Sequence, residues 1–262
     1  MTPGGSCGEG SRSSPVGRAD SLPPMSNPTV IPRPLECVFL DAGNTLLSPW
    51  PSFEGRLVTV AAQHGASFEE AQVEAAILAA DREAIWPTDW TDPATQREFW
   101  FGFYVSVLER LGHHGDPAEL AGALYDTFTD PASYRLFDDS RPALEALVAR
   151  GLKLGIISNF EPWLEEVLRL EGVLELFSAL AISGVLGVAK PQPEIFHAAL
   201  EKARVEPGAA IHVGDHPDVD GEAARAVGIA PVLIDRFKRL PPEAGPRIRS
   251  LTELVELVDA EA

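Results

Sequence analysis

The sequence predicts an α/β protein with a Rossmann-like, doubly wound parallel sheet as its core and an α-helical bundle inserted as a cap domain. After Arg141, apolar strand-like segments alternate with amphipathic helices. Repeated βα units of this length imply parallel strands joined by right-handed crossovers. A single buried strand near residue 37 precedes them, and only helical periodicity lies between. This order places a helical insertion directly after the first strand of the sheet.

The first strand is an apolar run, Cys37–Leu40, that stops abruptly at Asp41. Gly43 and Asn44 then supply residues typical of turns, and Thr45 offers a hydroxyl before apolar residues resume. Open α/β sheets bind ligands at the carboxyl ends of their strands. Asp41 is therefore a candidate nucleophile or metal ligand.

Composition limits the classes of protein that the chain can belong to. A chain of 262 residues with 45% hydrophobic content can bury a core as one large domain or two small ones. No apolar run approaches the ~18 residues of a membrane span, and no secretory signal precedes the fold, which predicts a cytoplasmic protein. The net charge of -18 argues against nucleic acid and anionic membranes as partners. An anionic substrate would need a local cation or a metal to offset this charge.

The first 33 residues are rich in Gly, Ser and Pro and lack a periodic apolar pattern, so we expect a disordered N-terminal extension. Only two methionines occur, Met1 and Met25. Because the folded pattern begins soon after the second, Met25 is a hypothetical true start of the protein.

Residues 50–138 are predicted to form an inserted helical bundle, between the two parts of the core at residues 34–49 and 139–262. After a prolyl loop, helices are expected at residues 53–64, 68–83, 95–111 and 117–129. Ser67, with Glu70 three residues later, predicts a capping box for the second helix. Helices without an intervening strand favour a small bundle whose core takes up most of the aromatic residues. Trp86 and Trp90 are kept as candidates for a pocket rim.

In the α/β half the pattern alternates regularly. Strands are expected at residues 152–158, 179–183, 209–213 and 229–234, and helices at 142–150, 162–170, 193–203, 222–227 and 251–258. Polar residues follow the strands: Ser158 and Asn159 after one, Asp215 and Asp220 after another, and Lys190 in a loop before a helix.

These residues should meet, because the carboxyl ends of parallel strands lie at one edge of the sheet. Carboxylates such as Asp41 and Asp215 are hard oxygen ligands suited to Mg²⁺. Ser158 adds a hydroxyl, Lys190 adds a positive charge, and backbone N–H groups after Asp41 can face an anion. The set predicts a phosphoryl-binding site. Asp41 would form an aspartyl-phosphate that water then hydrolyses, with metal and lysine offsetting the phosphoryl charge.

In the order of these motifs the chain resembles the haloacid dehalogenase superfamily, in the branch whose helical cap lies between the first and second motifs. The resemblance covers about residues 36–236. It implies that Asp41 is the nucleophile and that Thr45 is the motif-one threonine. It also implies catalytic and substrate-binding roles for Ser158, Asn159 and Lys190.

By the same resemblance, Mg²⁺ would be bound by Asp41, Asp215 and the carbonyl group of Gly43. Asp220 completes the metal site, acting through water or by orienting its neighbours. Residues 50–138 would be the helical cap that closes over a small phosphorylated substrate.

Gly43 departs from the family pattern, because phosphatases of this family usually have a second aspartate there as a general acid. The leaving group could be acidic enough to depart unaided, or His216 or a cap residue could replace the acid. The chain resembles a Mg²⁺-dependent phosphatase of a small metabolite. The alternatives are a metal-independent 2-haloacid dehalogenase, whose fourth motif is serine-rich where this chain has Asp215, and a weakly active regulatory binding protein.

Overall fold

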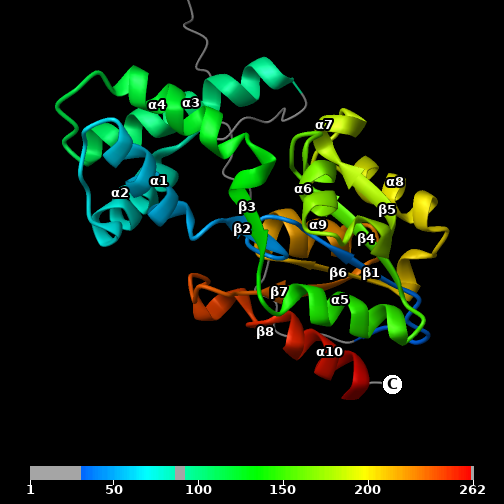
Figure 1. Cartoon of the computed structure of the whole chain (residues 1–262). Helices are drawn as coiled ribbons and strands as arrows, with labels where there is room; N and C mark the ends of the chain where they lie inside the picture. Colours follow the sequence, from blue (N-terminus) through cyan, green and yellow to red (C-terminus); the bar gives the residue numbers. More distant parts are fainter. Residues whose placement is uncertain (1–30, 86–91, 261–262) are drawn as a thin grey trace, which may run out of the picture.

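The computed structural model describes residues 31–85 and 92–260, which form a parallel sheet covered by helices and a separate helical bundle (Figure 1). The main sheet has six strands in the order β5-β4-β1-β6-β7-β8, and every pairing is parallel. Its strands are β1 (Cys37–Leu40), β4 (Lys153–Ser158), β5 (Phe177–Ile182), β6 (Ala210–Gly214), β7 (Ala230–Ile234) and β8 (Arg247–Ile248). This arrangement confirms the predicted α/β, Rossmann-like class.

Strand β1 lies at the centre of the sheet, between β4 and β6. Its residues are all completely buried and alternate between the two faces. Val38 and Leu40 belong to one apolar core, with α5 (Ser140–Ala149), α6 (Leu164–Leu170) and α10 (Leu251–Ala260). Cys37 and Phe39 belong to the other core, with α8 (Pro193–Ala203) and α9 (Ala223–Ala226). Helices therefore cover both faces of the sheet, and polar side chains that could act on a ligand lie at the strand ends.

The bundle consists of α1 (Phe53–Gln63), α2 (Glu70–Glu83), α3 (Pro93–Arg110) and α4 (Pro117–Phe128), and it has an apolar core of its own. Aspartates cap two of these helices: Asp92 accepts hydrogen bonds from two backbone N–H groups of α3, and Asp116 accepts one from α4.

The predicted capping box of the second helix was wrong in position. Glu69 is the cap, and it exchanges hydrogen bonds with Gln72, so that the helix starts at Glu70. Phe68, just before the cap, packs against the bundle core instead of continuing the helix.

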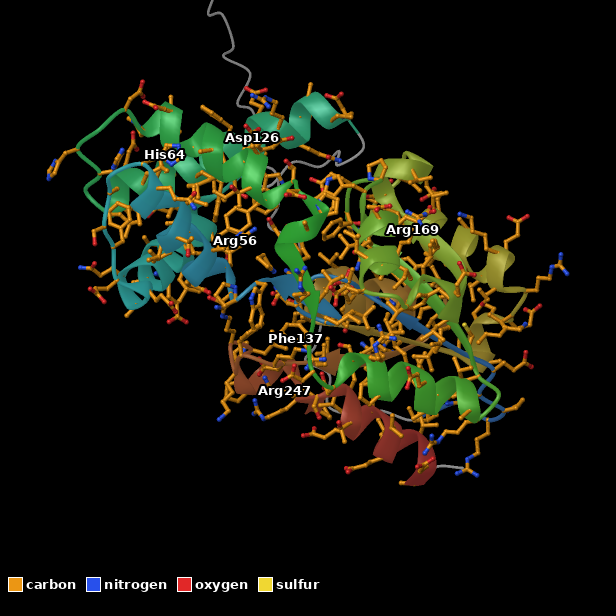
Figure 2. All side chains as sticks on the ribbon, viewed as in Figure 1. Arg56, His64, Asp126, Phe137, Arg169 and Arg247 are labelled. Carbon is orange, nitrogen blue, oxygen red and sulfur yellow. The ribbon has the colours of Figure 1, made fainter. Side chains whose placement is uncertain are left out.

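A short antiparallel ribbon joins the bundle to the sheet. It pairs β2 (Leu47–Pro49) with β3 (Tyr134–Leu136). The prediction of helix throughout this region was therefore wrong at β3. Three-residue strands carry no readable periodicity, and these two are far apart in the sequence. Figure 2 shows Arg56 near this ribbon, where its guanidinium donates to Ser133 Oγ at 2.7 Å.

Several sequence predictions concern residues at or beyond the ends of the described ranges. Residues 1–30, Trp86 and Trp90 lie outside them. Ile31, predicted to belong to the disordered extension, is buried in the sheet core. The division into extension, core and cap stays a prediction. Within residues 31–85 and 92–260, no helix is long and apolar enough to cross a membrane.

Candidate active site

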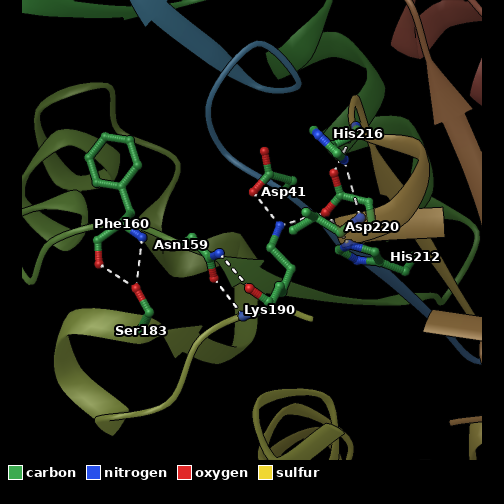
Figure 3. Close-up of polar contacts among 9 residues, drawn as sticks. Asp41, Asn159, Phe160, Ser183, Lys190, His212, His216 and Asp220 are labelled. Carbon is green, nitrogen blue, oxygen red and sulfur yellow. Dashed lines mark hydrogen bonds and ion pairs between the residues drawn. The ribbon is translucent and has the colours of Figure 1, made fainter. Parts of the chain in front are cut away.

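The predicted site residues meet at the carboxyl edge of the sheet. Asp41 follows β1, Ser158 ends β4, and Asp215 follows β6, and these strands are direct neighbours. The backbone N–H of Asp41 donates to the carbonyl of Val213 at 2.8 Å, which ties the first motif to β6. Lys190 reaches the same edge from the loop before α8 (Figure 3). The edge therefore brings together carboxylates, a hydroxyl and an ammonium from four distant segments.

Lys190 lies between two carboxylates. Its Nζ is 2.7 Å from Asp41 Oδ1 and 2.6 Å from Asp220 Oδ1, and its side chain is only 2% exposed. Burial alone would lower the pKa of Lys190, but the two carboxylates raise this pKa well above its usual value. The lysine is therefore a fixed ammonium that draws both acids together.

Asp220 is fully engaged by this network. Its Oδ1 also contacts His212 Nε2 at 3.0 Å, and its Oδ2 accepts the backbone N–H of His216 at 3.0 Å. Burial favours the neutral acid, but Lys190 and then His212 hold the pKa of Asp220 well below its usual range. Asp220 is thus placed to orient Lys190, and its direct ligation of a metal stays a prediction. His212 was missed from the sequence, where it is a single polar residue inside a buried strand.

Asp215 completes a group of acids that could bind a metal ion. Ligand oxygens of Asp41, Asp215 and Asp220 all lie within 4.8 Å of one another. Burial, followed by the charges of Asp41 and Asp220, raises the pKa of Asp215 to about 7. Three carboxylates share the single ammonium of Lys190, so the cluster carries excess negative charge. Hard oxygen ligands with excess negative charge suit a divalent cation such as Mg²⁺. Asp41 and Asp215 fit this role better than Asp220, whose oxygens already have partners.

The loop after Asp41 is shaped by a compact turn. Asn44 adopts a left-handed conformation with φ of 55°, which Asn tolerates better than most residues. Its side chain is hydrogen-bonded to Asp215, so it also joins the first and fourth motifs. At Gly43 an added Cβ would have no neighbour within 4 Å. No steric conflict therefore requires glycine at the position where family phosphatases usually have their acid.

Two further residues, not identified from the sequence, hold this loop from the side of the sheet. Arg236 Nε donates to the Thr45 carbonyl at 3.0 Å, and Ser140 Oγ donates to the Leu46 carbonyl at 2.7 Å. Both contacts join residues that are distant in the sequence. Thr45 itself is completely buried, and its Oγ1 has no hydrogen-bond partner among the described residues. The predicted catalytic role of Thr45 stays a prediction.

Ser158 and Asn159 act on the two reactive side chains in different ways. Ser158 is buried and hydrogen-bonded to Asp41. Burial raises the pKa of Asp41, and this rise is opposed by Lys190 and the Ser158 hydroxyl. The amide of Asn159 binds the backbone of Lys190 twice, accepting its N–H at 2.7 Å and donating to its carbonyl at 2.9 Å. Asn159 thus positions the lysine, while its predicted contact with substrate stays untested.

Fold and site together define an α/β enzyme that presents a buried carboxylate beside a lysine and a cation-binding acidic cluster at one sheet edge. A family profile described as haloacid dehalogenase-like hydrolase matches residues 35–228. The chain belongs to this family of hydrolases, as its motifs predicted.

Individual relatives agree with this membership. The chain is 35% identical, over 84% of its length and 95% of the relative, to haloacid dehalogenase-like hydrolase domain-containing protein 3 of Danio rerio. It is 32% identical, over 87% of its length and the whole of the relative, to a phosphoserine phosphatase of Thermus thermophilus. Among solved structures it is similar to a HAD phosphatase from Thermococcus onnurineus, with 26% identity, a TM-score of 0.58 and coverage of 87% of this chain and 99% of the other.

Proposed function

We propose that the chain is a Mg²⁺-dependent phosphatase that hydrolyses a small phosphorylated metabolite through an aspartyl-phosphate on Asp41. The main support is Lys190, whose ammonium is 2.7 Å from the candidate nucleophile. A buried cation beside a nucleophilic carboxylate suits a substrate with several negative oxygens. A relative that is matched over the whole of its length is named as a phosphatase, which supports the same reaction class.

The reaction would use the chain's own groups in two steps. A carboxylate oxygen of Asp41 attacks phosphorus, a new oxygen–phosphorus bond forms to give an acyl phosphate, and the bond to the leaving oxygen breaks. Water then attacks the same phosphorus, the bond from phosphorus to the Asp41 oxygen breaks, and inorganic phosphate and the free Asp41 carboxylate are released. Lys190 and the Ser158 hydroxyl stabilise the charged phosphoryl group in both steps. A Mg²⁺ ion bound at Asp41, Asp215 and the Gly43 carbonyl would supply further charge neutralisation.

Gly43 stands where phosphatases of this family usually have the acid that protonates the departing oxygen. Loss of a general acid costs about 10²–10⁴-fold when the leaving group needs a proton. We therefore expect a preference for acyl or aryl phosphates, whose leaving groups depart as weak bases. The helical bundle of α1–α4 would act as the cap over this site and contribute to substrate choice.

The test is hydrolysis of p-nitrophenyl phosphate and acetyl phosphate with Mg²⁺ and with EDTA. We expect turnover only with metal, and an Asp41→Asn variant that melts near the wild-type temperature but releases no phosphate. The matched control is Asp218→Asn, which replaces an exposed acid three residues after Asp215, and this variant should remain active. Activity retained in Asp41→Asn would show that the nucleophile is misassigned.

Two other outcomes would replace the proposal. Metal-independent release of chloride from 2-chloropropionate would indicate a dehalogenase. The buried acid Asp215 disfavours that outcome, because it would repel the substrate carboxylate when no cation offsets it. No turnover over a broad panel of phosphometabolites would indicate a binding protein.

A further inference from the structure

Glu161 is a partly buried acid that the proposed chemistry does not use. It lies three residues after Ser158, in the loop that leads from β4 to α6. Within residues 31–85 and 92–260, no Lys, Arg or His lies at ion-pair distance from its carboxylate, whereas every acid of the sheet-edge network contacts a cation or lies beside one that does. Burial raises the pKa of Glu161 above its usual value. A half-enclosed carboxylate without a cation is costly unless something else binds there.

Three tyrosines lie within electrostatic reach of this acid. Tyr104 comes from α3, Tyr125 from α4 and Tyr134 from the ribbon strand β3. Burial raises the pKa of all three hydroxyls, and the charge of Glu161 adds to the rise in each case. Glu161 therefore lies within electrostatic reach of the bundle and the ribbon at once. It sits where the sheet edge meets the helical bundle.

The aromatic enclosure continues on the sheet side. The Tyr134 ring is 5.9 Å from the ring of Phe160 and 5.2 Å from that of Trp163, centroid to centroid, and these residues flank Glu161 in the loop. The Tyr134 hydroxyl is occupied, because it donates to the Phe128 carbonyl at 2.8 Å. The ring of Tyr134 therefore offers apolar, electron-rich surface near Glu161, and its hydroxyl group is already bonded to another partner.

A carboxylate among aromatic rings has the chemistry of an ammonium site, since the ring faces and the acid both attract a cation. One of these rings already attracts a positive group: the guanidinium of Arg97 lies 4.9 Å from the Tyr125 ring centre. A cationic substrate also suits a chain with a net charge of -18, which repels purely anionic molecules.

We propose that Glu161, with Tyr134 beside it, binds the cationic part of the substrate, so that among phosphate esters with similar leaving groups those with an ammonium group on the alcohol are preferred. This inference rests on the proposed phosphatase function and names its substrate class. Ser158, on the same loop, contacts the nucleophile Asp41. The loop would therefore hold the phosphoryl group at one end and the ammonium a few residues further on.

The test compares O-phosphoethanolamine with propyl phosphate, which replaces the ammonium by a methyl group of similar size. At pH 8 with Mg²⁺, we expect wild-type kcat/KM to be at least about tenfold higher for O-phosphoethanolamine. A charge pair between the ammonium and a partly exposed carboxylate contributes less to binding than a fully buried pair, so we expect a factor near the lower limit for buried pairs. Glu161→Gln should bring the ratio of the two kcat/KM values close to one, through loss of O-phosphoethanolamine turnover. Glu165→Gln, at an exposed acid on α6, is the matched control and should keep the preference.

The outcomes separate this inference from the proposed function. If Glu161→Gln keeps the preference, or lowers turnover of both esters equally, Glu161 does not recognise the cation. If wild type hydrolyses neither ester, nor p-nitrophenyl phosphate, the phosphatase proposal fails. Calorimetry of the two esters binding to the Asp41→Asn variant then decides the inference alone. Tighter binding of O-phosphoethanolamine, lost when Glu161→Gln is added, supports it, and equal binding of both esters overturns it.

Discussion

The sheet edge and the helical bundle are buried by opposite means. At the edge, Lys190, Asp41, Asp220 and His212 form a chain of charged and polar contacts no longer than 3.0 Å. The bundle core is apolar and aromatic, and the rings of Phe53 and Phe128 stack there with centroids 4.3 Å apart. The sheet edge is stabilised by ion pairs and hydrogen bonds, and the bundle is stabilised by buried apolar surface and close packing.

This difference has an energetic consequence. Buried charges are stable only as a set, because loss of one partner leaves the others desolvated and unpaired. An apolar core loses stability roughly in proportion to the atoms removed, and it tolerates substitutions of similar volume. We therefore expect variants at the edge to change chemistry and stability together, and variants in the bundle core to change stability alone.

The largest effect is expected for Lys190→Met. The variant leaves Asp41 and Asp220 without their ammonium, and breaking such a buried pair costs about 3–5 kcal/mol of unfolding free energy. Loss of the cation at the phosphoryl group should also lower kcat by about 10²–10³-fold. Urea unfolding and turnover of p-nitrophenyl phosphate measure the two effects. Lys238→Met, at an exposed lysine in the loop after β7, should change neither. A loss of stability in Lys190→Met without a loss of kcat would contradict the expectation that chemistry and stability change together at the sheet edge.

The matched change in the bundle is Leu124→Ala. Leu124 is completely buried in α4, so the cavity should cost about 2–5 kcal/mol of unfolding free energy. Activity per folded molecule toward p-nitrophenyl phosphate should stay near wild type at 20 °C. Leu78→Ala, at a site 37% exposed, should cost much less. A large loss of kcat in Leu124→Ala would mean that bundle packing and edge chemistry are coupled.

Gly43→Asp tests whether the edge lacks only a general acid. Because nothing lies within 4 Å of an added Cβ, the new carboxyl group has room. We expect kcat toward alkyl phosphates to rise by about 10–100-fold, with a smaller rise for p-nitrophenyl phosphate. Gly43→Asn has the same shape without the proton and should give no rise. Equal rates in the two variants would point to a substitute acid already present, or to a loop that misplaces the carboxyl group.

The smallest effect concerns pH and metal. Burial and the neighbouring acids raise the pKa of Asp215 in the metal-free protein from its ordinary value of 3.8 to about 7, so the folded state keeps a proton there that the unfolded chain has lost. Stability from this group in the metal-free protein therefore falls as pH rises from about 4 to about 7. Mg²⁺ competes with that proton, so the Mg²⁺-induced rise in melting temperature should be larger at pH 8 than at pH 6. Scanning fluorimetry with NaCl of equal ionic strength checks this. The pH dependence should become weaker in Asp215→Asn.

Much of the sheet edge could be predicted, because its chemistry follows a local pattern. Each motif is a polar residue directly after an apolar strand, and parallel strands end at one edge, so Asp41, Ser158 and Asp215 could be placed together. The helix at Pro193–Ala203 was predicted with both ends correct, since proline and a following Pro-Gly pair mark them.

The residues that were missed work through long-range contacts. His212 looks like an ordinary strand residue until Asp220 is placed beside it, and Arg236 looks like a loop cation until its Nε meets the Thr45 carbonyl. Asn159 was predicted for the site, but its bonds to the Lys190 backbone could not be anticipated. No local spacing rule relates residues that meet only after the chain has folded.

The sequence by itself determined the fold class, the helical insertion, the family and the four motifs, because periodicity and strand-end residues are local properties. It also showed that Gly43 stands where an acid is expected. Tertiary structure alone decided the partners. Lys190 is shared by two acids, Asp220 is held by Lys190 and His212 whereas Asp215 is held by Asn44, and Glu161 lies within electrostatic reach of tyrosines from the bundle and the ribbon. Charge balance in a buried site depends on distances between segments far apart in the chain, and only the folded molecule sets those distances.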